Sequence, residues 1–190
     1  MKQLTMKRIR RYSAARIPAG ELFKEAFPPR EKIAWRIMLA YLNKPGVELW
    51  AFYEGDVFAG FAYMLLSQRY VYLLYCAVPE GLRGQGLGAL MVRRLLEHYS
   101  GRSMVLDIEP VDPSAENAAQ RLARFRFYER LGFQDTFWEM TDSTGDYRIL
   151  TSDAADFDIE DFRAMFSLLP PLFVGIDIVS KGSNREEASL

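Results

Sequence analysis

A continuous apolar run of nine residues, Tyr70–Val78, leads through a glycine-rich segment into a helical pattern. Such a run is typical of a strand that is buried on both faces. The following stretch, Leu87–Tyr99, places Leu87, Met91 and Leu95 on one face of a helix. A buried strand that turns through glycines into an amphipathic helix indicates the centre of an α/β domain.

The rest of the first 150 residues alternates between strand and helix patterns. Two helical stretches in residues 20–42 are interrupted at Pro28-Pro29, because proline is excluded from a helix interior. A second long helix is expected over residues 116–131, with Gly132 ending it as a C-cap. Period-two or apolar patterns predict the remaining strands at residues 6–11, 47–53, 57–66, 104–109, 133–140 and 147–150.

The pattern changes at residue 151. An acidic amphipathic helix is expected over Phe157–Leu169, stopped by Pro170-Pro171, and an added strand over Leu172–Val179. We therefore predict a main domain over residues 1–150, a helix–strand extension over 151–180 packed on that domain, and a flexible tail over 181–190. The added strand could also pair across a homodimer.

Composition narrows the function classes. The chain has one cysteine and one histidine, so neither a disulfide framework nor a metal site is expected, and the cysteine usage fits a cytoplasmic protein. No apolar run approaches the ~20 residues that a membrane helix requires. The net charge of -1 argues against nucleic acid as a partner, although residues 1–36 hold ten Lys and Arg. The Arg-rich start is interpreted as a charged first strand rather than a targeting peptide.

The glycine-rich segment between the buried strand and its helix is suited to a diphosphate. Amides in the first turn of a helix have no partner within the helix, and glycines let that backbone approach an anion closely. An arginine in the segment would add a charge-assisted contact. Neither the Lys-Ser/Thr pair of a P-loop nor the G-x-G-x-x-G spacing is present, and a merely connecting turn is the alternative. The candidate residues are Arg83, Gly84, Gln85, Gly86, Leu87, Gly88 and Ala89.

Two motifs resemble the signatures of the GCN5-related N-acetyltransferase (GNAT) superfamily. Arg83-x-x-Gly86-x-Gly88, following the strand that ends at Val78, resembles the family's coenzyme A pyrophosphate loop. Residues 127–133, FYERLGF, resemble its second signature at the end of a helix. The resemblance covers roughly residues 5–150, and the proline of the first motif, Pro79, lies one position earlier than is common.

The resemblance implies a fold, a co-substrate and site residues. It implies an α/β domain with a mixed, mostly antiparallel sheet, splayed in its middle and flanked by helices on both faces, with acetyl-CoA in the splay. The main chain of Cys76, Ala77 and Val78 would pair with the pantetheine arm, as an added strand does. The family's cofactor-contacting asparagine is replaced by Arg121, and Asn117 lies one turn earlier; either could touch the cofactor.

The resemblance also makes Tyr128 the general acid, because its phenol can donate a proton to the departing thiolate. For the base, the period of two places Asp107 and Glu109 on one strand face. Glu109 ends the strand and is the candidate, either as base or as an attraction for an ammonium group; attack by an already neutral amine would need no base. Covalent catalysis by Cys76 is not favoured, since a buried thiol in an apolar strand has a high pKa.

The function implied is direct transfer of an acetyl group from acetyl-CoA to a primary amine, either a small molecule or a peptide amino group. An acyl-CoA-binding sensor without catalysis is the alternative from another class. A further alternative is nucleic-acid binding through the basic first third and the arginines of residues 121–126. It predicts an affinity for DNA or RNA that falls steeply as the salt concentration rises.

Overall fold

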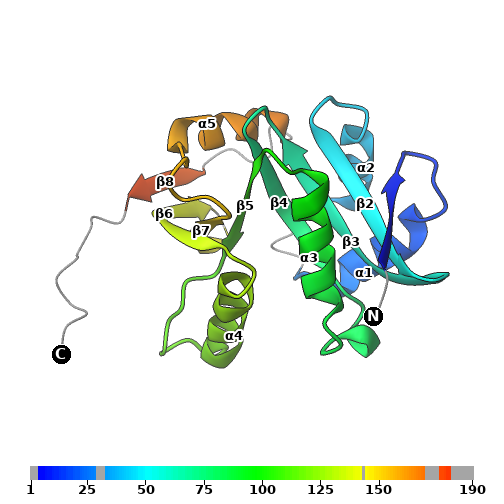
Figure 1. Cartoon of the computed structure of the whole chain (residues 1–190), viewed down its shortest axis with the longest axis horizontal. Coiled ribbons are helices and arrows are strands. Elements are labelled where there is room, and N and C mark those ends of the chain that lie inside the picture. Colours follow the sequence, from blue (N-terminus) through cyan, green and yellow to red (C-terminus); the bar gives the residue numbers. More distant parts are fainter. Residues whose placement is uncertain (1–3, 29–32, 143, 170–175, 181–190) are drawn as a thin grey trace.

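The strands of the protein form one open sheet, shown by a computed structural model that describes residues 4–28, 33–142, 144–169 and 176–180 (Figure 1). The strand order is β1-β2-β3-β4-β5-β7-β6-β8. Every pair of neighbours in the described sheet is antiparallel except β4 with β5. The bounds are β1 Leu4–Ile9, β2 Val47–Glu54, β3 Val57–Leu66, β4 Tyr70–Ala77, β5 Ser103–Ile108, β6 Gln134–Asp142, β7 Gly145–Thr151 and β8 Asp177–Ser180.

Helices cover both faces of the sheet. One buried cluster joins α1, α2 and α5 to the sheet, and a second cluster joins α3 and α4 to the opposite face. This arrangement confirms the fold that the sequence implied. Among the described residues, no helix has the length and apolar character needed to cross a bilayer. The helices are α1 Arg16–Ala26, α2 Trp35–Tyr41, α3 Leu87–His98, α4 Ala118–Glu129 and α5 Ile159–Ala164.

The sheet is splayed between its two central strands. β4 and β5 pair only over Tyr70–Tyr72 and residues 103–105, and they separate towards their C-terminal ends (Figure 1). On its other side β4 pairs with β3, but an extra residue, Leu74, bulges between Leu73 and Tyr75. A bulge bends its strand and increases the local twist. The end of β4 therefore turns away from β5 and leaves one edge of its main chain facing the gap.

Gly60 lets three elements meet behind this gap. Its φ is +150°, and a Cβ atom there would lie 2.3 Å from the carbonyl oxygen of Ala77 and 2.9 Å from the sulfur of Met91. β3, the end of β4 and α3 can approach this closely only because the residue has no side chain.

The C-terminal region differs from the expected pattern in length. The helix expected over Phe157–Leu169 is shortened to α5, followed by a 3₁₀ turn, η3, over Met165–Leu168. Asp158 sets the start of α5, because its carboxylate accepts the amides of residues 160 and 161. β8 pairs antiparallel with β6. The predicted strand residues 172–175, the predicted stop at Pro170-Pro171 and the tail 181–190 lie outside the described residues, and the homodimer stays a prediction.

Candidate functional site

The first component of the site is the loop before α3. Gly84 and Gly86 have φ of +74° and +79°, and Gly86 is the N-cap of the helix. As a glycine, Gly86 has no side chain to cap the amides of the first turn. A cavity of about 740 Å³ lies against this turn. Its lining includes seven of the predicted residues: Val78, Arg83, Gly84, Gly86, Leu87, Gly88 and Ala89.

Arginines give this loop cavity a positive character. Arg83 lines it and donates from Nε to the carbonyl oxygen of Val78 at 3.2 Å. Arg93 and Arg130 also line it, and the sequence analysis did not single them out. Arg93 lies two turns into the helix after the loop, so helical spacing could have indicated it. Three guanidinium groups beside a helix N-terminus make a site suited to a polyanion.

The other candidate of the loop, Gln85, is not among the residues that line the cavity. Its side-chain amide donates to the carbonyl oxygen of Gly81 at 3.4 Å. Gln85 therefore braces the loop, and a direct contact between its side chain and a ligand stays a prediction.

The second component is a central cavity of about 460 Å³. It lies in the splay, and Cys76, Glu109 and Tyr128 all line it. Val78 lines the loop cavity instead, so the two cavities lie on either side of the end of β4, with Ala77 between their lining residues. The strand edge that the sequence analysis assigned to a pantetheine arm thus runs from one cavity to the other.

Asp107 projects into the central cavity. Its Oδ1 accepts a hydrogen bond of 2.5 Å from the hydroxyl of Tyr72. Burial raises the pKa of the Asp107 carboxyl to about 6, and the charge of Asp142 adds to this effect, while the bond from Tyr72 opposes it. A carboxylate poised near neutral pH is suited to accept a proton. Strand periodicity places Asp107 on the same face as Glu109, but it indicates Glu109, at the strand end, as the base.

Glu109 has a different environment. Its oxygens lie 3.1 Å from Arg121 Nη2 and 2.7 Å from Arg124 Nη1. Burial raises the pKa of Glu109, but donation from Asn117 and Arg124 and the charges of both arginines outweigh it, so the pKa is lowered. A carboxylate held in this way has a low affinity for a proton.

Asn117 and Arg121 belong to this network. Arg121 Nε donates to Asn117 Oδ1 at 2.7 Å, and the amide of Asn117 donates to Glu109. Neither residue lines either cavity as the described residues define them. The network ties the start of α4 to the end of β5; contact of Asn117 or Arg121 with a cofactor stays a prediction.

Tyr128 is held by the way in which α4 ends. The amide of Phe133 donates to the carbonyl oxygen of Tyr128 at 3.1 Å, and that of Gly132 donates to Glu129 at 3.0 Å. With Gly132 at φ +93°, these bonds form a Schellman motif, and the C-cap prediction is confirmed. The ring of Tyr128 packs edge-on against Phe127 and Phe133.

The hydroxyl of Tyr128 and the neighbouring thiol of Cys76 stay protonated at neutral pH. Burial, followed by the nearby Cys76 group, raises the pKa of Tyr128. Burial also raises the pKa of the Cys76 thiol to about 12. Cys76 is therefore a weak nucleophile, while Tyr128 is available as a proton donor.

Comparison with known proteins finds the same family that the two sequence motifs resemble. The model of the acetyltransferase (GNAT) family matches residues 16–133. A GNAT-family protein from Bacteroides thetaiotaomicron has 21% identity and a TM-score of 0.70, over 89% of this chain and 98% of that one. The ribosomal-protein-S18-alanine N-acetyltransferase from Escherichia coli has 19% identity and a TM-score of 0.58, over 78% and 92%.

An aminoglycoside 6'-N-acetyltransferase complexed with coenzyme A has 14% identity and a TM-score of 0.62, over 81% of this chain and 99% of that one. At such identities the solved structures show a shared fold. No curated protein sequence matches the chain.

Proposed function

The chain belongs to the GNAT family of acetyltransferases, and from this premise we propose that it transfers the acetyl group of acetyl-CoA to a primary amine by direct attack in a ternary complex. The observation that carries the proposal is that the end of β4 has a cavity on each side, with Cys76 lining the central cavity and Val78 lining the loop cavity. The loop cavity offers main-chain amides and arginines to a diphosphate. The central cavity offers a protonated phenol and a carboxylate to the reacting groups.

The residues present fit the co-substrate along its length. The first-turn amides of α3, with Arg83, would hold the diphosphate. The open main-chain edge of residues 76–78 would pair with the amides of the pantetheine arm. Since Cys76 and Tyr128 line the same cavity, the thioester would lie beside the Tyr128 hydroxyl. Holding the thioester and the amine together supplies most of the acceleration in such a reaction.

Two residues that line the central cavity carry the proton transfers in this proposal: Asp107 accepts a proton and Tyr128 donates one. An ammonium group entering the central cavity loses a proton to the Asp107 carboxylate. The amine nitrogen then bonds to the carbonyl carbon of the acetyl group and the carbon–sulfur bond breaks. Tyr128 donates its proton to the departing sulfur, which leaves as free thiol. The nitrogen then gives its second proton back to the Tyr128 oxygen, which leaves a neutral amide and a protonated phenol. We favour Asp107 over Glu109 as the base because two arginines already neutralise Glu109.

Glu109 has a positioning role in this proposal. With Asn117 and Arg121 it joins β5 to the first turns of α4. That helix carries Tyr128 at its other end, so the network would fix the distance between the proton donor and the strand that carries Asp107. Glu109 as the base is the alternative, and the pH dependence of the rate separates the two.

The test is acetyl transfer by the purified full-length chain. Acetyl-CoA is mixed with a panel of amines and peptides, and the release of free thiol is followed together with the mass of the acceptor. We expect a gain of one acetyl group on an amine nitrogen, in step with thiol release. If acetyl-CoA binds but no acceptor gains mass, the non-catalytic sensor replaces the enzyme.

A further inference from the structure

The outer wall of the central cavity comes from residues beyond the part of the chain that the family model matches. That match ends at residue 133. The later residues that line the cavity come from the β6–β7 hairpin, from η3 and its end, and from the approach to β8. They are Met140, Asp142, Thr144, Tyr147, Phe166, Leu169 and Ile176.

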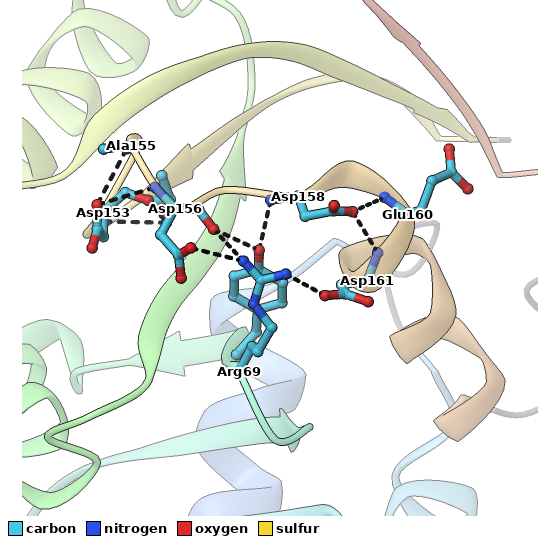
Figure 2. Close-up of polar contacts among 9 residues, drawn as sticks. Arg69, Asp153, Ala155, Asp156, Asp158, Glu160 and Asp161 are labelled. Carbon is cyan, nitrogen blue, oxygen red and sulfur yellow. Dashed lines mark hydrogen bonds and ion pairs between the residues drawn. The ribbon is translucent and has the colours of Figure 1, made fainter.

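Polar contacts hold this region against the turn between β3 and β4 (Figure 2). Arg69 donates to the carbonyl oxygen and to the carboxylate of Asp156, at 2.8 and 3.0 Å, and forms an ion pair with Asp161. The hydroxyl of Tyr70 accepts from the amide of Asp158 at 2.6 Å. These contacts join residues 156–161 to the main domain at several points.

Aromatic packing completes the attachment. Phe162 is fully buried, and its ring lies 5.2 Å from that of Tyr72 and 5.3 Å from that of Phe166. Tyr72 is also the donor to Asp107. The segment that forms the outer wall is therefore packed directly on the residue that orients the proposed base.

The charged side chains that line the central cavity can accommodate one cation. Among the lining residues that the structure describes, the charged groups are Asp107, Glu109, Arg124 and Asp142. Glu109 is neutralised by its arginines. One carboxylate oxygen of Asp142, Oδ1, stabilises the turn between β6 and β7. It accepts hydrogen bonds from the amide and the hydroxyl of Thr144 at 2.7 and 2.5 Å. A single ammonium group between Asp107 and Asp142 would relieve the repulsion between these two carboxylates.

The uncharged lining combines four tyrosines and Thr144 with aliphatic and phenyl side chains. Among the latter, Phe27 follows α1, Ile33 and Ile37 come from the α2 region, and Phe166 and Leu169 come from the C-terminal region. A second or third ammonium group would lose its hydration without gaining a carboxylate that is not already paired. A hydroxyl-rich ring would meet a similar penalty where it lies against the aliphatic and phenyl side chains, whereas an apolar body would gain from burial there.

We propose that the acceptor is a compact primary amine with one positive charge and an aromatic or aliphatic body, selected by the wall formed by Phe166, Leu169 and Ile176 and by the carboxylates of Asp107 and Asp142. This inference rests on the proposed acetyl transfer and names its substrate class. It separates this chain from enzymes that act on polycations or on the exposed amino end of a protein.

The test compares kcat/KM for 2-phenylethylamine, spermidine, kanamycin and a hexapeptide that begins with alanine. We expect the value for 2-phenylethylamine to exceed each of the others by at least about tenfold. A higher value for spermidine, kanamycin or the peptide would overturn the inference and leave the proposed acetyl transfer intact. Binding of acetyl-CoA without transfer to any of the four would overturn both.

Two variants test how the cavity selects the acceptor, with readouts that do not depend on how much of each variant folds. Phe166→Ala should raise the ratio of kcat/KM for tryptamine to that for 2-phenylethylamine by at least about threefold, since it enlarges the cavity. This ratio does not depend on the folded fraction of the variant. Asp142→Asn keeps an oxygen for the turn but removes the charge, and it should raise KM for 2-phenylethylamine while KM for acetyl-CoA stays unchanged. An unchanged ratio and an unchanged amine KM would contradict the proposal.

Discussion

The two cavities on either side of the end of β4 are built in different ways. The loop cavity is formed largely by one continuous segment, residues 82–89, and it offers main-chain amides with arginines around them. The central cavity gathers side chains from residues 27 to 176, and its reactive groups come from separate strands and helices. In our proposal the first binds the part of the co-substrate that every family member shares. The second sets the chemistry and the choice of acceptor.

If this division is correct, Asp107→Asn should damage only the central cavity. Asparagine can still accept the hydrogen bond from Tyr72, but it cannot take a proton. We expect kcat to fall by about a thousandfold, with the dissociation constant of acetyl-CoA unchanged. The matched variant Glu109→Gln should have a much smaller effect. The reverse order of the two effects would make Glu109 the base.

Tyr128→Phe tests the proposed proton donor of the central cavity. Removing the hydroxyl leaves the ring packing against Phe127 and Phe133 in place. We expect kcat to fall by about a hundredfold, again with unchanged affinity for acetyl-CoA. Steady-state kinetics and calorimetry measure the two quantities. A variant with full turnover would show that the leaving thiolate needs no acid from the protein.

The pH dependence of kcat/KM separates the two carboxylates in the wild-type protein. Burial raises the pKa of Asp107 to about 6, so the base is lost as the pH falls through this value, and kcat/KM should fall about tenfold per pH unit below it. If Glu109 were the base, its lowered pKa would place that limb below the ordinary range of a glutamate side chain. A limb near 6 that disappears in Asp107→Asn supports the proposed base, and a flat profile down to pH 5 contradicts it.

Gly86→Ala should damage only the loop cavity. The position has space for a methyl group but a φ of +79°, so alanine would strain the turn that presents the amides, at a cost of roughly 1 kcal/mol. We expect KM for acetyl-CoA to rise about fivefold with little change in kcat. Gly101→Ala is the control, because that residue has a φ of +94°, equally open space and a place in a turn away from both cavities. Equal effects of the two changes on KM would contradict a role for the loop in binding.

The conformation of the loop could be predicted from the sequence because the information there is local, whereas its contact with a diphosphate stays a prediction. Glycines at 84 and 86, a helix starting at Leu87 and a helix ending at Gly132 are all expressed within short motifs. The family and the fold follow from the order of those motifs. Even so, the lining arginines Arg93 and Arg130 were missed, since each lies on a helix and not in the loop.

The central cavity could not be predicted in the same way. Strand periodicity placed Asp107 and Glu109 on one face, but only tertiary structure shows that arginines from α4 neutralise one and that Tyr72 orients the other. The roles of Asp142 and Phe166 depend on how residues 134–169 pack on the rest of the chain. No spacing of residues in the sequence indicates those tertiary contacts.

The proposed function requires that the amides of residues 86–89 and the guanidinium of Arg83 bind a diphosphate. A calorimetric titration of the wild-type protein with acetyl-CoA tests this most directly. We predict saturable heat with a dissociation constant between about 1 µM and 1 mM, the usual range for an enzyme and its substrate. The affinity should weaken in Gly86→Ala and stay constant in Asp107→Asn. No heat of binding at millimolar acetyl-CoA would contradict the assignment of the loop, and with it the proposed function.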